Sequence, residues 1–409
     1  MTPKDRTLQP AAPEQVGLSS AGLKRIDAAL QALIDKGELA GAVTLVGRRG
    51  RLVHTSAMGK KDLASGEPLK TDTIFRIFSM TKPVTGVAMM ILHDQGLWRP
   101  EDPICKHLPA FEGLEVAARN LDGELVRVAA DHAPTMAELM THAAGFSYGF
   151  DPSDPVDGLY REANPLGAAD LGQMVERLAD LPLNYQPGSE WRYSLSMDIQ
   201  GAIIEALTGE SLPAFMRTRI FEPLGMVDTA FHTPPEKRER LATCYRMSET
   251  RGLVPLDRPL IGRDYDAPPK LALGGGGLVS TAADYARFAQ MLLNKGELAG
   301  RRIVSASAIE LMMRNHLSEA LMAGGFGVGF QQIRPGFGHG FDGAVFTDPE
   351  LAGVPVGKGT YQWDGAAGTW FWVDPTNDLL FVGLIQRMAL PGSPAVQTIT
   401  QTLMAEALL

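Results

Sequence analysis

The chain has 409 residues, of which 45% are apolar and 21% are charged, and its formal net charge is −9. This length exceeds what one ordinary core holds, so two packed lobes are expected, and the composition excludes a disordered chain. The acidic surplus, with no offsetting cluster of lysine or arginine, argues against a surface that binds nucleic acid.

The chain shows no signal for export or for membrane insertion. Its first 20 residues are polar and lack the apolar core of a secretory signal. Its longest apolar stretches, at 84–92 and 379–385, are too short to span a bilayer. Two cysteines, Cys105 and Cys244, lack the paired spacing of a disulfide framework or a zinc site. We therefore expect a cytoplasmic protein with neither a membrane partner nor a metal.

The N-terminal part predicts a helix, a hairpin and a second helix. Apolar residues in the segment 20–34 recur on one helical face. Strands are expected at 42–47 and 51–58, on either side of the turn Arg48-Arg49-Gly50. A longer helix is expected from Ser79 to Gln95, where a glycine ends it.

The middle of the chain, from 101 to about 269, predicts a mainly helical lobe. Its helical patterns alternate with loops rich in proline and glycine. The expected helices are 135–141, 168–181, 197–208 and 212–220. After this lobe, Gly274 to Gly277 predicts close backbone packing ahead of a capping box from Thr281 to Asp284.

Strand character returns near the C-terminus. The segments 369–373 and 379–385 predict an antiparallel pair, with Trp370 and Trp372 on one face. Ser393-Pro394 predicts the N-cap of a last helix. Because helices and strands lie beside each other at both ends of the chain, we expect one sheet built from both termini.

These elements predict an α/β fold in two parts. The sheet domain is expected to be discontinuous, formed by 1–78 and 271–409, with an antiparallel sheet flanked by helices. A mainly helical domain at 79–270 is inserted into it, and the active site is expected at the interface. The exact boundary within 230–270 stays open, because that stretch is irregular.

Ser79 and Lys82 are the first candidate catalytic pair, in the run Ser79-Met80-Thr81-Lys82. A serine hydroxyl is a weak nucleophile until a base takes its proton. A lysine three residues later on a helix lies on the same face, and burial would lower its pKa enough to make it a base. Alone, the spacing also describes a helix cap beside a surface lysine.

Two later segments strengthen this pair. Tyr193 follows a Pro-Gly turn and could relay protons to a leaving group. Trp363-Asp364-Gly365-Ala366 begins the C-terminal sheet, where the Ala366 N–H would join the Ser79 N–H in an oxyanion hole. Taken alone, Tyr193 also fits a buried loop aromatic, and Gly365 also fits a strand bend.

The order of these motifs resembles the serine β-lactamase and penicillin-binding-protein superfamily. The three motifs are Ser79-Met80-Thr81-Lys82, Tyr193-Ser194-Leu195 and Trp363-Asp364-Gly365. The chain looks in particular like the class C-related branch that contains the family VIII carboxylesterases, over about residues 17 to 400. The resemblance implies a β-lactamase/transpeptidase-like fold, with Ser79 as the acylated nucleophile and Lys82 and Tyr193 as the general acid/base pair.

Two positions depart from the class C pattern. Leu195 stands where those enzymes have the asparagine of Tyr-x-Asn, and Trp363 stands where they have the lysine of Lys-Thr-Gly. Both changes make the expected substrate site, formed by Leu195, Trp363, Asp364 and Gly365, more apolar and less suited to an anionic antibiotic. Asp364 adds negative charge, which also disfavours carboxylate substrates.

A second serine lies in a motif that the sequence context argues against. Gly145-Phe146-Ser147-Tyr148-Gly149 matches the nucleophile elbow of α/β-hydrolases, which needs a strand before the serine and a helix after it. Here a helical pattern precedes Ser147 and a loop at 151–155 follows it. The eight histidines show no metal-ligand spacing, and His142, at a helix end, is expected to have a structural role.

The sequence thus predicts a carboxylesterase that hydrolyses short-chain esters through an acyl-enzyme on Ser79, without a cofactor. Weak β-lactam hydrolysis would use the same acyl chemistry. The alternatives are a β-lactamase or D-alanyl-D-alanine carboxypeptidase, an acyltransferase, and a non-enzymatic β-lactam sensor. The expected partner is a small-molecule ester, and the choice between a monomer and a homo-oligomer stays open.

Overall fold

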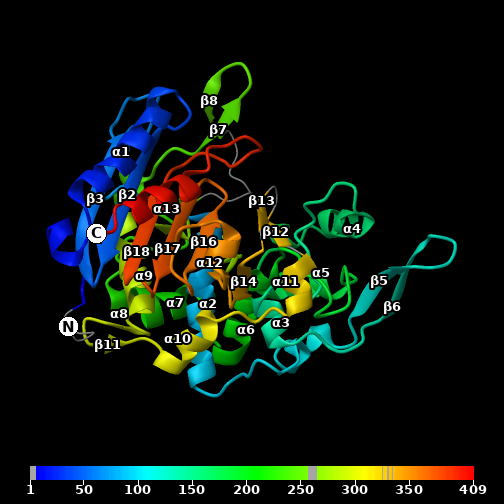
Figure 1. Cartoon of the computed structure of the whole chain (residues 1–409). Coiled ribbons are helices and arrows are strands. Elements are labelled where there is room, and N and C mark those ends of the chain that lie inside the picture. Colours follow the sequence, from blue (N-terminus) through cyan, green and yellow to red (C-terminus); the bar gives the residue numbers. More distant parts are fainter. Residues whose placement is uncertain (1–5, 257–264, 325, 329–330, 334) are drawn as a thin grey trace.

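An eight-stranded sheet forms the centre of the computed structural model, which describes residues 6–256, 265–324, 326–328, 331–333 and 335–409 (Figure 1). Its strands come from both ends of the chain, as the sequence predicts. Neighbouring strands are antiparallel except for the outer pair β1–β3. In spatial order the strands are β1 (Gln9–Pro10), β3 (Arg51–Gly59), β2 (Gly41–Arg48), β18 (Leu379–Leu384), β17 (Thr369–Asp374), β16 (Tyr361–Gly365), β15 (Gly343–Phe346) and β14 (Phe337–Gly340).

Helices cover both faces of this sheet. The terminal helices α1 (Ser20–Asp35) and α13 (Val396–Glu406) pack against each other on one face, and α9 (Ala282–Leu293) packs on the other (Figure 1). Alternation along β17 turns Trp370 and Trp372 toward the terminal helices, where both indoles are buried, as predicted. The Trp370 indole N–H donates to Thr400 of α13 at 3.1 Å.

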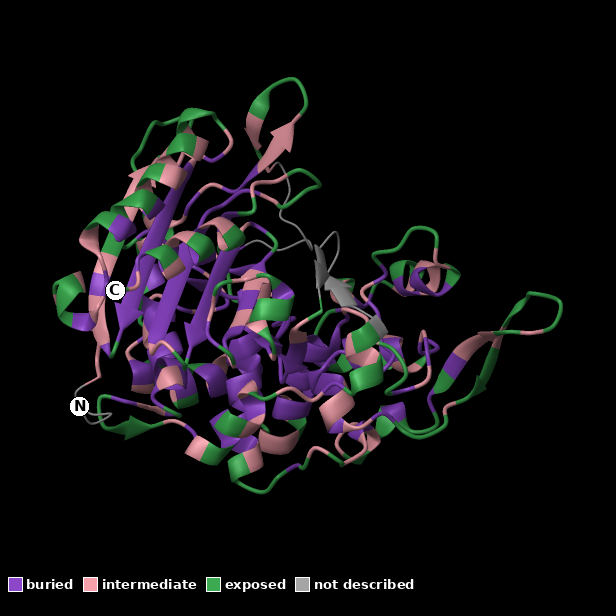
Figure 2. Cartoon of the chain, in the orientation of Figure 1, coloured by how far each residue is buried: buried purple, intermediate pink, exposed green. Residues whose placement is uncertain are grey.

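The remaining elements are mainly helices and small hairpins outside the central sheet. Helix α2 packs against α6 and α10, and the β5–β6 hairpin projects from the body of the molecule with its tip exposed (Figure 2). The helices are α2 (Thr81–Asp94), α3 (Met136–Met140), α4 (Pro155–Ala163), α5 (Leu171–Ala179), α6 (Ser196–Thr208), α7 (Leu212–Met216), α8 (Glu222–Leu224), α10 (Ala306–Met313), α11 (Glu319–Gly324) and α12 (Pro349–Ala352). The strands are β4 (Phe75–Arg76), β5 (Glu115–Arg119), β6 (Leu125–Ala129), β7 (Tyr245–Ser248), β8 (Gly252–Pro255), β9 (Val279–Ser280), β10 (Glu297–Leu298), β11 (Arg301–Arg302), β12 (Phe326–Val328) and β13 (Gln331–Ile333).

Several predicted element boundaries are wrong. The last helix has Ala395 as its N-cap and begins at Val396, because the Ser393 hydroxyl instead accepts the N–H of Leu390. Thr281 caps α9 as predicted, but the Asp284 carboxylate turns away from the cap and binds the N–H of Asp228, so the capping box is incomplete.

The division into two domains stays a prediction, although the strands of the main sheet do come from both ends of the chain. Among the described residues, no helix combines the length and the apolar character that crossing a membrane requires. The cytoplasmic location stays a prediction as well.

The packing of the terminal helices predicts a large stability loss for Trp372→Ala. Trp372 is 1% exposed and stacks on Phe381 with ring centroids 4.3 Å apart, so removing it opens a cavity under α1 and α13. We expect the free energy of unfolding in urea to fall by about 3–5 kcal/mol. As a control, Leu121→Ala, at an exposed leucine on the β5–β6 turn, is expected to change it by less than about 0.5 kcal/mol. Equal effects of the two substitutions would contradict this account of the core.

Candidate active site

Ser79 lies in a single 3-10 turn, Phe78–Met80, directly before α2. The α-helix itself begins at Thr81, two residues later than predicted. Phe78 adopts a φ of 43°, a strained conformation for a bulky residue that is typical of functional turns. This turn places the Ser79 hydroxyl beside the first turn of α2, and Ser79 itself is partly exposed.

Lys82 is completely buried at the start of α2 and points its amine at Ser79. The Nζ atom lies 3.3 Å from the Ser79 Oγ, 3.1 Å from the Tyr148 hydroxyl oxygen and 2.6 Å from the Gly275 carbonyl oxygen. Burial lowers the pKa of Lys82 to about 8, against the opposing field of Asp198 and other carboxylates. The predicted pair is therefore in contact.

Tyr193 completes this group from the other side of Ser79. Its hydroxyl donates to the Ser79 Oγ at 2.7 Å, and the Lys82 Nζ lies 4.6 Å from the centre of its ring. Burial raises the pKa of Tyr193 above its ordinary value, and the hydrogen bond to Ser79 opposes this rise. The structure thus brings together the three residues that the sequence proposed.

Three further residues hold the Lys82 amine, and sequence reasoning missed their part. Tyr148 lies between Lys82 and Asp198, because its hydroxyl is also 3.3 Å from the Asp198 Oδ2. The other oxygen of Asp198 accepts the N–H of Gly275 at 2.8 Å. No side chain fits at Gly275, since a Cβ atom there would lie 2.6 Å from both the Tyr148 and the Asp198 oxygens. The close packing predicted for the glycine run 274–277 is therefore confirmed at Gly275 and also at Gly274, where a Cβ atom would lie 2.3 Å from the carbonyl oxygen of Met197.

The end of β16 lies against the turn that carries Ser79. A Cβ atom on Gly365 would lie 2.3 Å from the carbonyl oxygen of Ile77, so glycine is required for this approach. In the described part of the chain, neither the Ser79 N–H nor the Ala366 N–H has a hydrogen-bond partner. These two donors fit the oxyanion hole expected from the sequence, and their role stays a proposal.

The comparisons with known proteins agree with this geometry. A family model described as Beta-lactamase matches residues 26–404. The chain belongs to the β-lactamase family. Protein Rv1367c of Mycobacterium tuberculosis is 37% identical over 365 residues, covering 88% of this chain and 89% of that protein. Esterase EstB of Burkholderia gladioli is 31% identical over 383 residues, with 88% and 89% covered.

A solved structure extends the likeness to the fold. EstCE1, described as a hydrolase with promiscuous acyltransferase activity, superposes with a TM-score of 0.77 at 28% identity, over 94% of this chain and 98% of EstCE1. Within the β-lactamase family, the chain is a hydrolase of the esterase type. The predicted fold and the predicted resemblance to the family VIII esterases are both confirmed.

The residues that depart from the class C pattern occupy three different environments. Leu195 is 1% exposed in the main core and forms the N-cap of α6, and its contact with substrate stays a prediction. Trp363 packs its ring 5.9 Å from the ring of Tyr193. Asp364 is half-buried on the strand face that Gln362 turns toward α13, and burial raises its pKa to about 6. The negative charge of Asp364 raises the pKa of Lys82 and so opposes the effect of burial. The contact of Asp364 with substrate stays a prediction.

Ser147 and His142 both have structural partners. The Ser147 hydroxyl donates to Asp157 at 2.5 Å and accepts the N–H of Gly149, so this serine ties a loop together. His142 is buried, and its Nδ1 atom accepts the N–H of Ser194 at 3.2 Å. In the ranges that the structure describes, no three His, Cys, Asp or Glu side chains gather where they could hold a metal ion.

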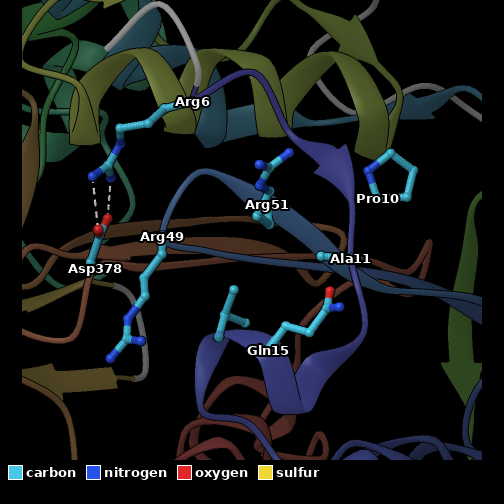
Figure 3. A pocket seen from close by; sticks show the side chains of 8 residues that line it. Arg6, Pro10, Ala11, Gln15, Arg49, Arg51 and Asp378 are labelled. Carbon is cyan, nitrogen blue, oxygen red and sulfur yellow. Dashed lines mark hydrogen bonds and ion pairs between the residues drawn. The ribbon is translucent and has the colours of Figure 1, made fainter. Parts of the chain in front are cut away.

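A hollow of about 630 Å³ lies away from Ser79, beside the N-terminal strand (Figure 3). Its lining includes Arg6, Gln15, Arg49, Arg51 and Asp378. Arg6 is paired with Asp378, and the guanidinium groups of Arg49 and Arg51 point in different directions in Figure 3. Because these groups do not converge, the hollow offers no single anion site, and it adds nothing to the site around Ser79.

The fit around Gly275 predicts that Gly275→Ala impairs ester hydrolysis. The new methyl group would push Tyr148 and Asp198 away and so displace the Lys82 amine from Ser79. A shift of about 1 Å at a catalytic group costs about 100-fold in kcat. The matched control is Gly276→Ala, where a Cβ atom meets nothing closer than 3.8 Å. Similar kcat values for the two folded variants would contradict the positioning role of the Gly275 contact.

Proposed function

We propose that the protein is a serine carboxylesterase that acts on short-chain esters through an acyl-enzyme on Ser79. The observation that carries this proposal is the position of the Ser79 Oγ, which lies between the Tyr193 hydroxyl at 2.7 Å and the Lys82 Nζ at 3.3 Å. A nucleophile within reach of a base, which other groups hold in place, is the arrangement that acyl transfer needs.

The opposite pKa shifts of Lys82 and Tyr193 support an assignment of roles. Burial lowers the pKa of Lys82 to about 8 and raises that of Tyr193, so a neutral amine and a protonated phenol coexist above pH 8. A neutral Lys82 amine has two N–H groups and one lone pair. A protonated Lys82 donates to all three neighbouring oxygens, those of Ser79, Tyr148 and Gly275. When Lys82 is neutral, Gly275 and Tyr148 still accept its two N–H groups, and the Ser79 hydroxyl donates to its lone pair.

The proposed reaction then follows from these contacts. The Ser79 Oγ attacks the ester carbon while its proton passes to the Lys82 amine, and the carbonyl oxygen becomes an oxyanion near the Ser79 and Ala366 N–H groups. The tetrahedral intermediate collapses by breaking the bond to the alcohol oxygen. Tyr193 gives a proton to the departing alkoxide and takes one from Lys82. Water attacks the acyl-enzyme by the same relay, which releases the acid and restores Ser79.

The surroundings of Ser79 support a small, neutral acyl group. The rings of His142, Trp191 and Trp363 surround Tyr193, with centroids 4.9 to 6.4 Å from the centroid of the Tyr193 ring. They form the aromatic surroundings of the site next to Tyr193. Trp363 supplies no cation for a substrate carboxylate, and Asp364 next to it is acidic. We therefore propose that β-lactam hydrolysis is weak. The similarity to EstCE1, a hydrolase with promiscuous acyltransferase activity, supports acyl transfer to alcohols as a proposed side activity of this chain.

Replacement of the nucleophile tests the proposal directly. Ser79→Ala is expected to reduce the hydrolysis of p-nitrophenyl butyrate to near background, because the substitution removes the hydroxyl that bonds to both Lys82 and Tyr193. The wild-type protein mixed with a slowly hydrolysed ester is expected to gain the mass of the acyl group, and the folded variant is not. Circular dichroism checks the fold.

Two controls sharpen this test. Ser147→Ala is expected to keep substantial activity, since Ser147 bonds to the Asp157 carboxylate and the Gly149 N–H and not to Lys82 or Tyr193. Full activity of Ser79→Ala would contradict the assignment of Ser79 as the nucleophile. A wild-type protein that hydrolyses nitrocefin faster than the butyrate ester would favour the β-lactamase alternative.

The pKa of Lys82 predicts the pH dependence of the reaction. As a base, Lys82 is active when it is deprotonated, so kcat/KM is expected to rise about tenfold per pH unit below pH 8 and to level off above it. Rates between pH 6 and pH 10, corrected for spontaneous hydrolysis, measure this. Asp364→Asn separates the two groups. A pH dependence caused by Asp364, whose pKa is raised to about 6, would vanish in this variant, whereas the pH dependence caused by Lys82 would remain and move to lower pH, because the Asp364 charge raises the pKa of Lys82. A kcat/KM profile that does not change slope near pH 8 would contradict the role of Lys82 as the base.

A further inference from the structure

The loop that contains Ser147 is held rigidly beside the site. Besides the two bonds of Ser147, the Asp157 carboxylate accepts the N–H of Asp151 at 2.8 Å. Arg161 donates to the carbonyl oxygens of Gly149 and Asp151 at 2.9 and 2.8 Å. Gly149 itself takes a left-handed φ of 75°, which glycine adopts without strain. The loop is therefore fixed on both sides of the two aromatic residues that it carries.

Those two residues, Tyr148 and Phe150, form a continuous aromatic surface from the buried amine to the solvent. Their rings are stacked, with centroids 4.9 Å apart and planes inclined by 11°. The inner ring also lies 5.1 Å from the ring of Tyr193 and touches Lys82 through its hydroxyl. The outer ring, Phe150, is 65% exposed. A rigid loop thus holds an apolar ring in water at the edge of the site.

The chemistry of the proposed reaction decides which part of an ester meets this surface. The carbonyl oxygen is directed to the N–H groups of Ser79 and Ala366, at the end of β16. The alcohol oxygen has to receive a proton from the Lys82–Tyr193 pair, so the alcohol lies on the side of that pair. Tyr148 borders both members of the pair, and Phe150 continues its surface outward.

We propose that Phe150 is a specificity-determining residue that binds the apolar, preferably aromatic, group of the ester's alcohol. This inference rests on the proposed function and specifies which alcohol group the esterase prefers in its substrate. An aromatic group placed on Phe150 would remove the exposed face of that ring from water and stack on it. The preferred substrates are then short acyl esters of aromatic or bulky apolar alcohols.

The test compares benzyl butyrate with ethyl butyrate, two esters that form the same acyl-enzyme. Their kcat/KM values report on acylation, and the intrinsic reactivity of each ester cancels when a variant is compared with the wild type. Phe150→Ala is expected to lower the benzyl-to-ethyl ratio about tenfold. Phe150→Tyr, which keeps the ring, is expected to preserve the ratio.

Two further arms make the result decisive. With ethanol as the fixed alcohol, the ratio of ethyl octanoate to ethyl butyrate is expected to stay the same in Phe150→Ala, since the acyl chain lies elsewhere. Leu121→Ala, at an exposed leucine on the projecting hairpin, is expected to leave every ratio unchanged. An unchanged benzyl-to-ethyl ratio, or a shift of the octanoate ratio instead, would overturn the proposal. The proposed function is tested separately by Ser79→Ala. If that variant still hydrolyses the esters, the proposed function is wrong, whatever the ratios show.

Discussion

Burial of the Lys82 amine is the constraint on which the site depends. Removing an ammonium group from water is costly, so the folded protein favours the neutral amine and the pKa falls to about 8. The amine still needs hydrogen-bond partners, and the fold supplies them from three segments far apart in the chain. Ser79 lies on the same turn as Lys82, whereas Tyr148 and Gly275 are 66 and 193 residues away. The burial of one side chain thus fixes how these segments meet.

The sheet provides the second half of the site because one of its strands is short. Strand β15 pairs with β16 only at Tyr361 and Gln362, and no other strand in the described part of the chain pairs with the following part of β16 on that side. The turn that carries Ser79 packs against this part of β16, as the contact between Gly365 and Ile77 demonstrates. A longer β15 would have covered this edge with a regular ladder. Ala366, directly after this part of β16, is exposed, which supports its proposed role in the oxyanion hole.

The parts of the structure that the sequence predicted well depend on local patterns. Helix α1, the β2–β3 hairpin and the Ser79–Lys82 pair each rest on spacings of a few residues, which periodicity and turn chemistry determine. The β5–β6 hairpin was missed because most of its residues are exposed and give no clear alternation. Asp198 and Tyr148 were missed for another reason, since their importance comes from contacts across 50 residues or more, which no local pattern reveals.

The loop around Ser147 illustrates how a motif misleads when it is separated from its context. Gly-x-Ser-x-Gly in an α/β-hydrolase places serine on a strained turn between a strand and a helix. Here the same letters form a loop between α3 and α4 in which Ser147 is 2% exposed and bonded to Asp157. The serine faces inward to hold the loop, so the residues beside it are the ones presented to the site. Because Gly149 turns the chain between them, Tyr148 reaches Lys82 while Phe150 remains in solvent. The contribution of this loop to the site therefore comes from its rings and not from its hydroxyl.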